Sequence, residues 1–246
     1  MRKFQSTAHM QKYLFSLSVS LACGLFLLTG SSSSEKVITL PQPTETTTTD
    51  VCEELYHTLH LDSLVEHKAF HQAVEGFYKI KNRKRDVLTL IDFSKPSTEK
   101  RLFVIDMQAR KLLFATVVSH GKNSGDKYAT SFSNESGSHK SSLGFYLTED
   151  TYRGRNGYSL ILNGLEKGIN DNAKERAIVV HGAAYSNPSI IQSCGRLGRS
   201  FGCPAVPQTL SRPIIDAIKG GSVLYIYAPQ PDYLAQSSIL TDSSHG

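Results

Sequence analysis

From residue 86 onward the sequence is a series of short β-rich apolar runs that no regular helical segments separate. The first two read V-L-T-L-I-D-F and L-F-V-I-D-M, and such branched and aromatic residues favour strands. The runs lie at residues 87–93, 102–107, 111–120, 143–148, 158–162, 177–181 and 222–228. They predict a body of about eight strands. Because helices do not alternate with these strands, the pattern favours a mainly β fold, a β-sandwich or partly open barrel, over a nucleotide-binding α/β layout.

Two helical regions are expected around this body. Residues 51–80 carry apolar side chains at helical spacing, which predicts a helical N-terminal lead-in, residues 51–85, of two short helices. A further short helix is expected at residues 208–219, inside the β-rich domain, which is predicted to begin at residue 86. This domain is expected to end at residue 228, leaving a C-terminal tail over residues 229–246.

The N-terminus has the pattern of a targeting segment. Basic residues precede a charge-free stretch over residues 13–30, and small residues follow it, so residues 1–30 are predicted to be a secretory signal peptide. The alternative is an uncleaved membrane anchor; a lipoprotein site at Cys23 is disfavoured because S-L-A before it misses the usual leucine register. Residues 31–50 are rich in Ser and Thr and predict a flexible tether. The chain is therefore expected to be exported, to the periplasm or cell envelope.

Net charge selects no partner. The chain has 27 basic and 22 acidic residues; of these, three basic and one acidic residue precede residue 36, which leaves a formal +3 for the remainder. This balance does not argue for nucleic acid, and none is expected as a partner. The basic run at residues 79–85 reads as a solvated connection or, alternatively, as a patch that attracts an anionic envelope polymer.

Beyond the leader three cysteines remain, Cys52, Cys194 and Cys203. An oxidising compartment tends to pair exposed thiols, and an odd number leaves at least one free. A disulfide between Cys52 and Cys194 would spare Cys203; the alternative is that both are unpaired. A free thiol outside the cytosol suggests a reactive role.

A histidine and a cysteine stand in positions that suit chemistry. I-V-V-H-G ends a predicted strand with His181, and Gly182 is expected to let the chain turn there. The alternative is a histidine that merely caps a strand edge. Downstream, glycines recur in C-G-R-L-G-R-S-F-G-C-P, so backbone N–H groups around Gly202 and Cys203 could form an oxyanion hole. A Cys–His pair with such donors suffices for thioester acyl transfer.

Two nearby arginines, Arg196 and Arg199, are expected to favour the thiolate of Cys203 and to bind a substrate carboxylate. Pro204 fixes the chain beyond the nucleophile. Cys194 also precedes a glycine, but it lacks the S-x-G frame and is the weaker candidate nucleophile.

The motifs H-G-A-A-Y and G-R-L-G-R-S-F-G-C-P-A-V-P closely resemble the active-site signature of the L,D-transpeptidase (YkuD-type) catalytic domain, in the murein branch with Pro-Ala after the cysteine. V-S-H-G-K-N-S-G, F-S-N-E-S-G-S and S-S-L-G-F-Y extend the resemblance over roughly residues 85–228. It implies that Cys203 is the nucleophile and His181 the general base. Gly202 and Ser200 match the residues that frame the cysteine, and Gly182 follows the base.

The sequence departs from the commoner branch of this family, S-H-G-C with Arg or Asn two places later. Phe201 stands in place of that histidine and Ala205 in place of the later residue. Arg196 and Arg199 are the candidates for the missing positive charge. His120, in the second S-H-G, is the candidate for a supporting donor near the substrate.

The resemblance implies an enzyme that transfers acyl groups between peptidoglycan stem peptides, with no metal or organic cofactor and as a monomer. Two alternatives stay open: an L,D-carboxypeptidase or endopeptidase in which water resolves the thioester, and a non-catalytic wall-binding domain. The intact Cys–His pair argues against the last.

Other polar residues have simpler interpretations. Four histidines at helical spacing, without the glutamate or cysteine that a zinc site needs, are expected on helix surfaces: His57, His60, His67 and His71. Asp92 and Asp106 could orient His181, although turn or sheet-edge roles are favoured.

Overall fold

A computed structural model describes residues 48–241. The predicted leader, Cys23 and nearly all of the predicted tether lie outside the described residues. Within residues 48–241 no helix is long and apolar enough to span a bilayer.

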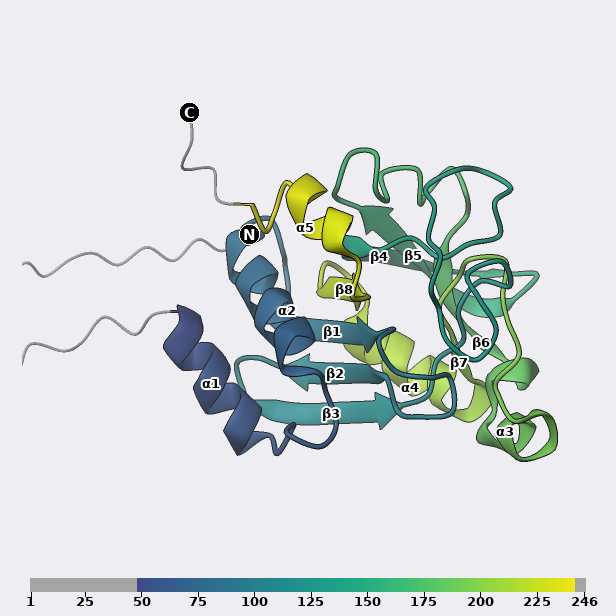
Figure 1. The fold of residues 1–246 in the computed structure, drawn as a ribbon, viewed down its shortest axis with the longest axis horizontal. Helices are drawn as coiled ribbons and strands as arrows, with labels where there is room; N and C mark the ends of the chain where they lie inside the picture. The colour runs from purple at the N-terminus through teal and green to yellow at the C-terminus, as the bar shows by residue number, and fades with distance from the viewer. Residues whose placement is uncertain (1–47, 242–246) are drawn as a thin grey trace, which may run out of the picture. The chain divides into compact units, whose positions relative to one another are not determined.

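Eight strands form one mainly antiparallel sheet in the order β3-β2-β1-β8-β4-β5-β6-β7 (Figure 1). The strands are β1 Val87–Asp92, β2 Leu102–Asp106, β3 Lys111–Thr116, β4 Gly144–Gly154, β5 Gly157–Gly164, β6 Val179–Ala183, β7 Ala205–Pro207 and β8 Val223–Tyr227. Two neighbouring pairs are parallel, β1 with β8 and β6 with β7. The prediction of a mainly β fold is confirmed.

The two edges of this sheet come together beyond β3. Ser119, which follows β3, forms an antiparallel bridge with Ala205 of β7. The Ser119 N–H donates to the Ala205 carbonyl at 2.8 Å, and the reverse bond is 3.4 Å long. The sheet is therefore a nearly closed, partly open barrel, and β7 lies at its seam.

The predicted N-terminal helices are α1, Thr48–Thr58, and α2, His67–Lys79. Five apolar residues of α2 are buried at helical spacing: Ala69, Phe70, Ala73, Val74 and Phe77. Their burial contributes about 1.5–3 kcal/mol for each large side chain. The Phe145 ring lies where a Cβ on Gly76 would be, only 2.1 Å from its nearest atom, so a glycine is required for α2 to lie this close to the sheet. The helices thus share one hydrophobic core with the strands.

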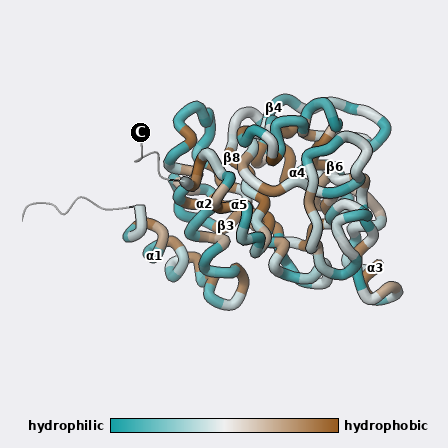
Figure 2. The backbone as a smooth tube through the Cα atoms, turned by 45° about the horizontal axis from the view of Figure 1, so that its top comes forward, coloured by the Kyte–Doolittle hydropathy of each residue, from teal (hydrophilic) through white to brown (hydrophobic). Residues whose placement is uncertain are grey.

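The remaining helices are α3 Pro188–Cys194, α4 Gln208–Ile218, α5 Pro231–Gln236 and the 3₁₀ turn η1 Ala184–Ser186. Of these, α4 was predicted; α3 is an unpredicted helix, and α5 falls in the predicted C-terminal tail. In Figure 2 the hydrophobic stretches lie mostly inside, around β8 and α4, whereas peripheral loops are hydrophilic.

Candidate active site

Cys203 and His181 line the same surface cavity, which has a volume of about 380 Å³. Its lining residues are Arg155, Asn156, His181, Tyr185, Arg199, Ser200, Phe201 and Cys203. They come from the β4–β5 turn, from β6 and η1, and from the loop before β7. The structure therefore brings together the two residues that the sequence singled out for catalysis.

A short parallel strand pair sets this proximity. His181 on β6 is aligned with Ala205 on β7, two residues after Cys203. A turn was predicted at Gly182, but the chain does not turn there, because β6 continues through this glycine to Ala183. Instead, a Cβ on Gly182 would lie 2.6 Å from the Ser211 Oγ, so this glycine lets α4 approach β6 closely.

The environment of His181 favours the neutral form of its ring. Its Nδ1 lies 3.1 Å from the Gly182 carbonyl oxygen, which can only accept, so Nδ1 carries the proton and the Nε2 lone pair is free in the neutral ring. Burial lowers the pKa of His181, and the bond to Gly182 partly opposes this. A backbone carbonyl, and neither Asp92 nor Asp106, therefore orients the ring.

The thiol of Cys203 is buried and protonated at rest. Its Sγ lies 3.5 Å from the donating N–H of Val179, and the S–H points to the Ala177 carbonyl at 3.6 Å. Burial raises the pKa of Cys203, while the Val179 N–H and the charge of Arg176 oppose the increase. The expectation of a depressed thiol pKa was wrong, because burial outweighs the positive charges.

Within residues 48–241 the structure has no hydrogen bond between the Cys203 thiol and the His181 ring. Catalytic hydrogen bonds are often long or misaligned in a substrate-free enzyme and tighten when substrate binds. Both side chains already line one cavity.

Ser200 fixes the turn that carries Cys203. Its Oγ donates to the Cys203 carbonyl at 2.6 Å and accepts the Gly202 N–H at 3.1 Å. Gly202 has a φ of +126°, and a Cβ there would lie 2.8 Å from the Lys140 carbonyl oxygen. Because the Gly202 N–H is already bonded, the Cys203 N–H is the better candidate donor for an oxyanion.

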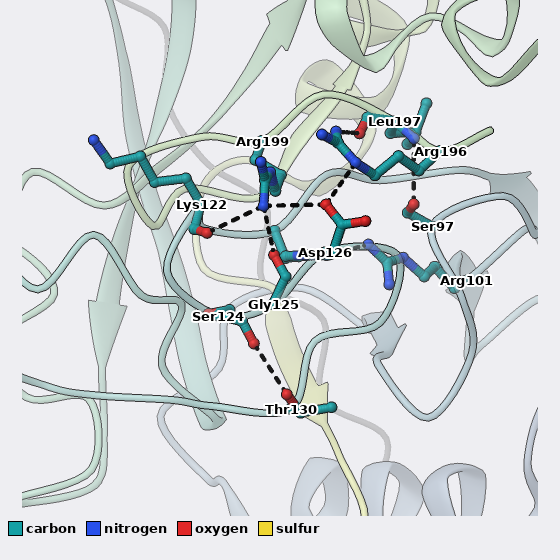
Figure 3. A network of polar contacts seen from close by, with 11 residues as sticks. Ser97, Arg101, Lys122, Ser124, Gly125, Asp126, Thr130, Arg196, Leu197 and Arg199 are labelled. Carbon is teal, nitrogen blue, oxygen red and sulfur yellow. Dashed lines mark hydrogen bonds and ion pairs between the residues drawn. The ribbon is translucent and has the colours of Figure 1, made fainter. Parts of the chain in front are cut away.

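Of the two expected arginines, only Arg199 lines the cavity. Figure 3 shows Asp126 between Arg196 and Arg199, at 2.7 and 3.3 Å from their nitrogens. Arg199 also donates to the Gly125 carbonyl at 3.0 Å. The ion pairs between Asp126 and the two arginines therefore connect two loops. Asp126 also compensates part of the positive charge that was expected to stabilise the thiolate of Cys203.

His120 is not available to a substrate, contrary to its expected role, because it is buried. The Arg101 Nη2 donates to its Nδ1 at 2.8 Å, and burial followed by the Arg101 charge lowers the pKa of His120 to about 4. The His120 carbonyl accepts the Ser200 N–H at 2.9 Å. Its support of the site is thus indirect, through the backbone of the nucleophile loop.

Phe201 is the one large apolar side chain at this site that is mostly exposed, at 67%, among the residues described. The His139 ring packs against it with centroids 4.6 Å apart, and the Lys122 ammonium lies 4.7 Å from its ring centre. The residue that departs from the commoner family motif therefore forms part of the cavity mouth.

Sequence reasoning missed Arg155, Asn156, Tyr185 and Arg176. Arg155 and Asn156 occupy the β4–β5 turn. They reach the cavity because this hairpin is long, and its length was not predicted. Tyr185 directly follows H-G-A-A, so its place in this motif was a signal for a site residue. Burial and then the charge of Cys203 raise the pKa of Tyr185 to about 12. Arg176 offered no signal.

The remaining candidates lie elsewhere. All three cysteines of the described part are free; Cys52 is buried in α1 and Cys194 is exposed at the end of α3. These helices lie at opposite sides of the molecule in both Figure 1 and Figure 2, so the suggested disulfide is not formed. The Asp92 carboxylate accepts the N–H groups of Ser94 and Glu66.

The other polar residues hold local structure. Asp106 accepts the Ala109 N–H in the turn after β2, the kind of role that was favoured. His57 and His67 both approach Glu53 of α1. Among residues 48–241 no three His, Cys, Asp or Glu side chains are grouped as metal ligands.

A family model described as the L,D-transpeptidase catalytic domain matches residues 61–227. Among solved structures, an L,D-transpeptidase from Mycobacterium smegmatis is 15% identical, with 58% of this chain and 59% of that chain covered and a TM-score of 0.37. One from Stackebrandtia nassauensis is 14% identical, with coverages of 73% and 77% and a TM-score of 0.35. One from Mycobacterium tuberculosis H37Rv is 13% identical, with 58% of each chain covered and a TM-score of 0.38. No curated protein sequence matches significantly.

Proposed function

Because the chain belongs to the L,D-transpeptidase catalytic domain family, which its match over residues 61–227 establishes, we propose that it transfers acyl groups between peptidoglycan stem peptides through a thioester on Cys203. The observation that carries this assignment is the presence of Cys203 and His181 in one cavity, with the Nε2 lone pair of His181 free. A thiol and a neutral imidazole are the nucleophile and base that this chemistry requires.

In the first half-reaction, His181 Nε2 takes the proton of the Cys203 thiol as sulfur attacks the carbonyl carbon before a terminal D-amino acid. The Cys203 N–H stabilises the oxyanion of the tetrahedral intermediate. The C–N bond then breaks, and the leaving amine takes the proton from the His181 imidazolium. A thioester remains on Cys203, and the D-amino acid departs.

In the second half-reaction an amine of another stem peptide attacks the thioester carbonyl and gives a proton to His181. The C–S bond breaks, a new amide forms, and His181 returns the proton to the sulfur. Water in place of the amine would give a shortened stem instead of a cross-link. The difference between transferase and hydrolase thus lies only in the acceptor.

Two cationic side chains suit a substrate that carries carboxylates. Arg199 and Arg155 both line the cavity, and Arg155 pairs with no acidic residue in the described part of the chain. A guanidinium binds a carboxylate bidentately. Arg155 is therefore the stronger candidate for a stem-peptide carboxylate, with Arg199 beside it. Export to the periplasm or cell envelope, proposed from residues 1–30, would place the enzyme with this substrate.

Mass spectrometry of the purified protein incubated with a tetrapeptide muropeptide tests the proposal. A thioester adduct on the peptide containing Cys203, together with a cross-linked dimer, is the expected result. Accumulation of tripeptide without dimer would assign the hydrolase, and no adduct or product would contradict both activities. Cys203→Ala is the negative control.

A further inference from the structure

Arg176 lies three residues before β6 and has an unusual set of partners. Its Nη1 donates to the Ser133 carbonyl at 2.8 Å and to the Ser142 Oγ at 2.5 Å. Its Nη2 donates to the Lys140 carbonyl at 2.6 Å and to the Ser138 Oγ at 3.3 Å. All four acceptors are uncharged, and no carboxylate in residues 48–241 forms an ion pair with this guanidinium. Its positive charge is therefore not neutralised locally.

The segment that Arg176 holds also contacts the nucleophile loop. Between Lys140 and Ser142, the Ser141 Oγ donates to the Gly202 carbonyl at 3.0 Å. A Cβ on Gly202 would lie 2.8 Å from the Lys140 carbonyl oxygen and 3.3 Å from the Arg176 Nη2. The guanidinium is thus next to Gly202, the residue that precedes Cys203, and it does not line the cavity.

We propose that Arg176 is the positioning residue of the nucleophile: it holds residues 133–142 against Gly202, and its uncompensated charge stabilises the thiolate of Cys203. It supplies the positive charge that the motif suggested for Arg196 and Arg199, both of which pair with Asp126. The assignment rests on Cys203 being the nucleophile of the proposed function.

The pKa shifts of Arg176 and Cys203 both indicate that the two groups interact electrostatically. Burial raises the pKa of Cys203, and the charge of Arg176 opposes this increase. Burial lowers the pKa of Arg176, and the charges of Tyr146 and then Cys203 oppose this decrease. The other titratable groups nearby are Tyr146 beside Arg176, and Tyr185 and His181 on the cavity side of Cys203. At neutral pH these three are uncharged in their ordinary states. Arg155 and Arg199 also line the cavity with Cys203, but Arg176 is the cation whose charge lowers the pKa of the thiol.

The test measures the thiol pKa of Cys203 without any peptide substrate. Alkylation by iodoacetamide is followed against pH in the full chain carrying Cys194→Ser, because Cys194 is exposed. The Cys52 thiol is buried and its pKa is raised to about 12, so it reacts little. We expect Arg176→Gln to move the titration of Cys203 to higher pH by about one unit, and Arg176→Lys to leave it near that of the parent. Arg212→Gln, on α4, is the matched control.

A purely structural role predicts the opposite direction. Burial is what raises the thiol pKa, so a loosened loop would expose Cys203 and move its titration to lower pH. An unchanged or lowered value in Arg176→Gln overturns the proposal. If Arg176→Gln does not fold, Arg176→Lys and Ser142→Ala provide the test, because both keep the positive charge while removing hydrogen bonds. A shift of the Cys203 titration to higher pH in either variant overturns the proposal.

Turnover of a muropeptide gives a second readout. Because Arg176 does not line the cavity, Arg176→Gln is expected to lower kcat at least tenfold and leave KM unchanged. Failure of the proposed function would remove turnover in the parent protein as well, whereas the alkylation profiles would still report the effect of Arg176 on Cys203.

Discussion

His181 on β6 and Ala205 on β7 face each other in a parallel pair, and this register places the imidazole beside the loop that ends in Cys203. β7 has only three residues, Ala205–Pro207, so His181 and the loop of Cys203 are held together by a very short ladder. A shift of one residue in this register would turn His181 away from the cavity, since strand side chains alternate between faces.

Removal of either member of the pair should abolish or strongly reduce turnover. We expect no product from Cys203→Ala and a loss on the order of 10²–10⁴-fold from His181→Ala, because a general base contributes that much. Rates of muropeptide conversion, normalised to folded protein, are the measurement. Cys194→Ala is the matched control and should retain most activity; a dead Cys194 variant, or less than a tenfold loss in His181→Ala, would contradict these roles.

Simple thiol reagents should label Cys194 before Cys203. Cys194 is exposed at the end of α3, whereas Cys203 is buried and burial raises the pKa of its thiol. Cys52, buried in α1 with a pKa of about 12, should be labelled only after unfolding. Peptide mapping after brief iodoacetamide treatment gives the order. Faster labelling of Cys203 than of Cys194 would mean that the thiol is more ionised than its surroundings indicate.

The pH dependence of kcat/KM should remain flat to lower pH than an ordinary histidine allows. Burial lowers the pKa of His181 below 6.5, so the ring stays neutral and able to accept a proton as pH falls through that value. The raised pKa of Cys203 places the alkaline limit above 9.0. The profile is measured with one muropeptide and compared with unfolding at each pH. An acid limb at or above 6.5 in folded protein would refute the assignment.

Gly202→Ala should lower both stability and activity. Its φ of +126° is unfavourable for a side chain, and a Cβ would collide with the Lys140 backbone. We expect a loss of about 2–4 kcal/mol in the free energy of unfolding. Gly168→Ala is the control, because its φ is +77° but nothing lies within 4 Å of the added Cβ. Equal losses from urea unfolding of the two variants would show that the backbone contact at Gly202 has no effect.

The sequence predicts the strands well because long apolar β-branched runs have few alternatives, as in β1 and β8, whose residues are all buried. It misses β7, since three residues ending in proline give no periodic signal. The cysteine and histidine could be found because local motifs surround them.

The charges around the site could not be predicted in this way. Asp126 pairs with Arg196 and Arg199 only because two separate loops meet in the fold. Arg176 depends equally on residues 133–142, far away in the chain. Gly182 was misread because a glycine at the end of an apolar run indicates a turn, whereas here the missing side chain makes room for Ser211 of α4. Long-range contacts decide each case, and no local pattern encodes them.

The bridge between Ser119 and Ala205 also has a temporal consequence. It joins distant parts of the chain. Such contacts form late in folding, because closing a long loop costs entropy before the new contacts stabilise it. The same strand, β7, aligns with His181. A nascent or partly unfolded chain therefore contains both the thiol and the imidazole without bringing them together. We expect the proposed reactivity toward acyl donors to appear only when the last edge of the sheet has closed.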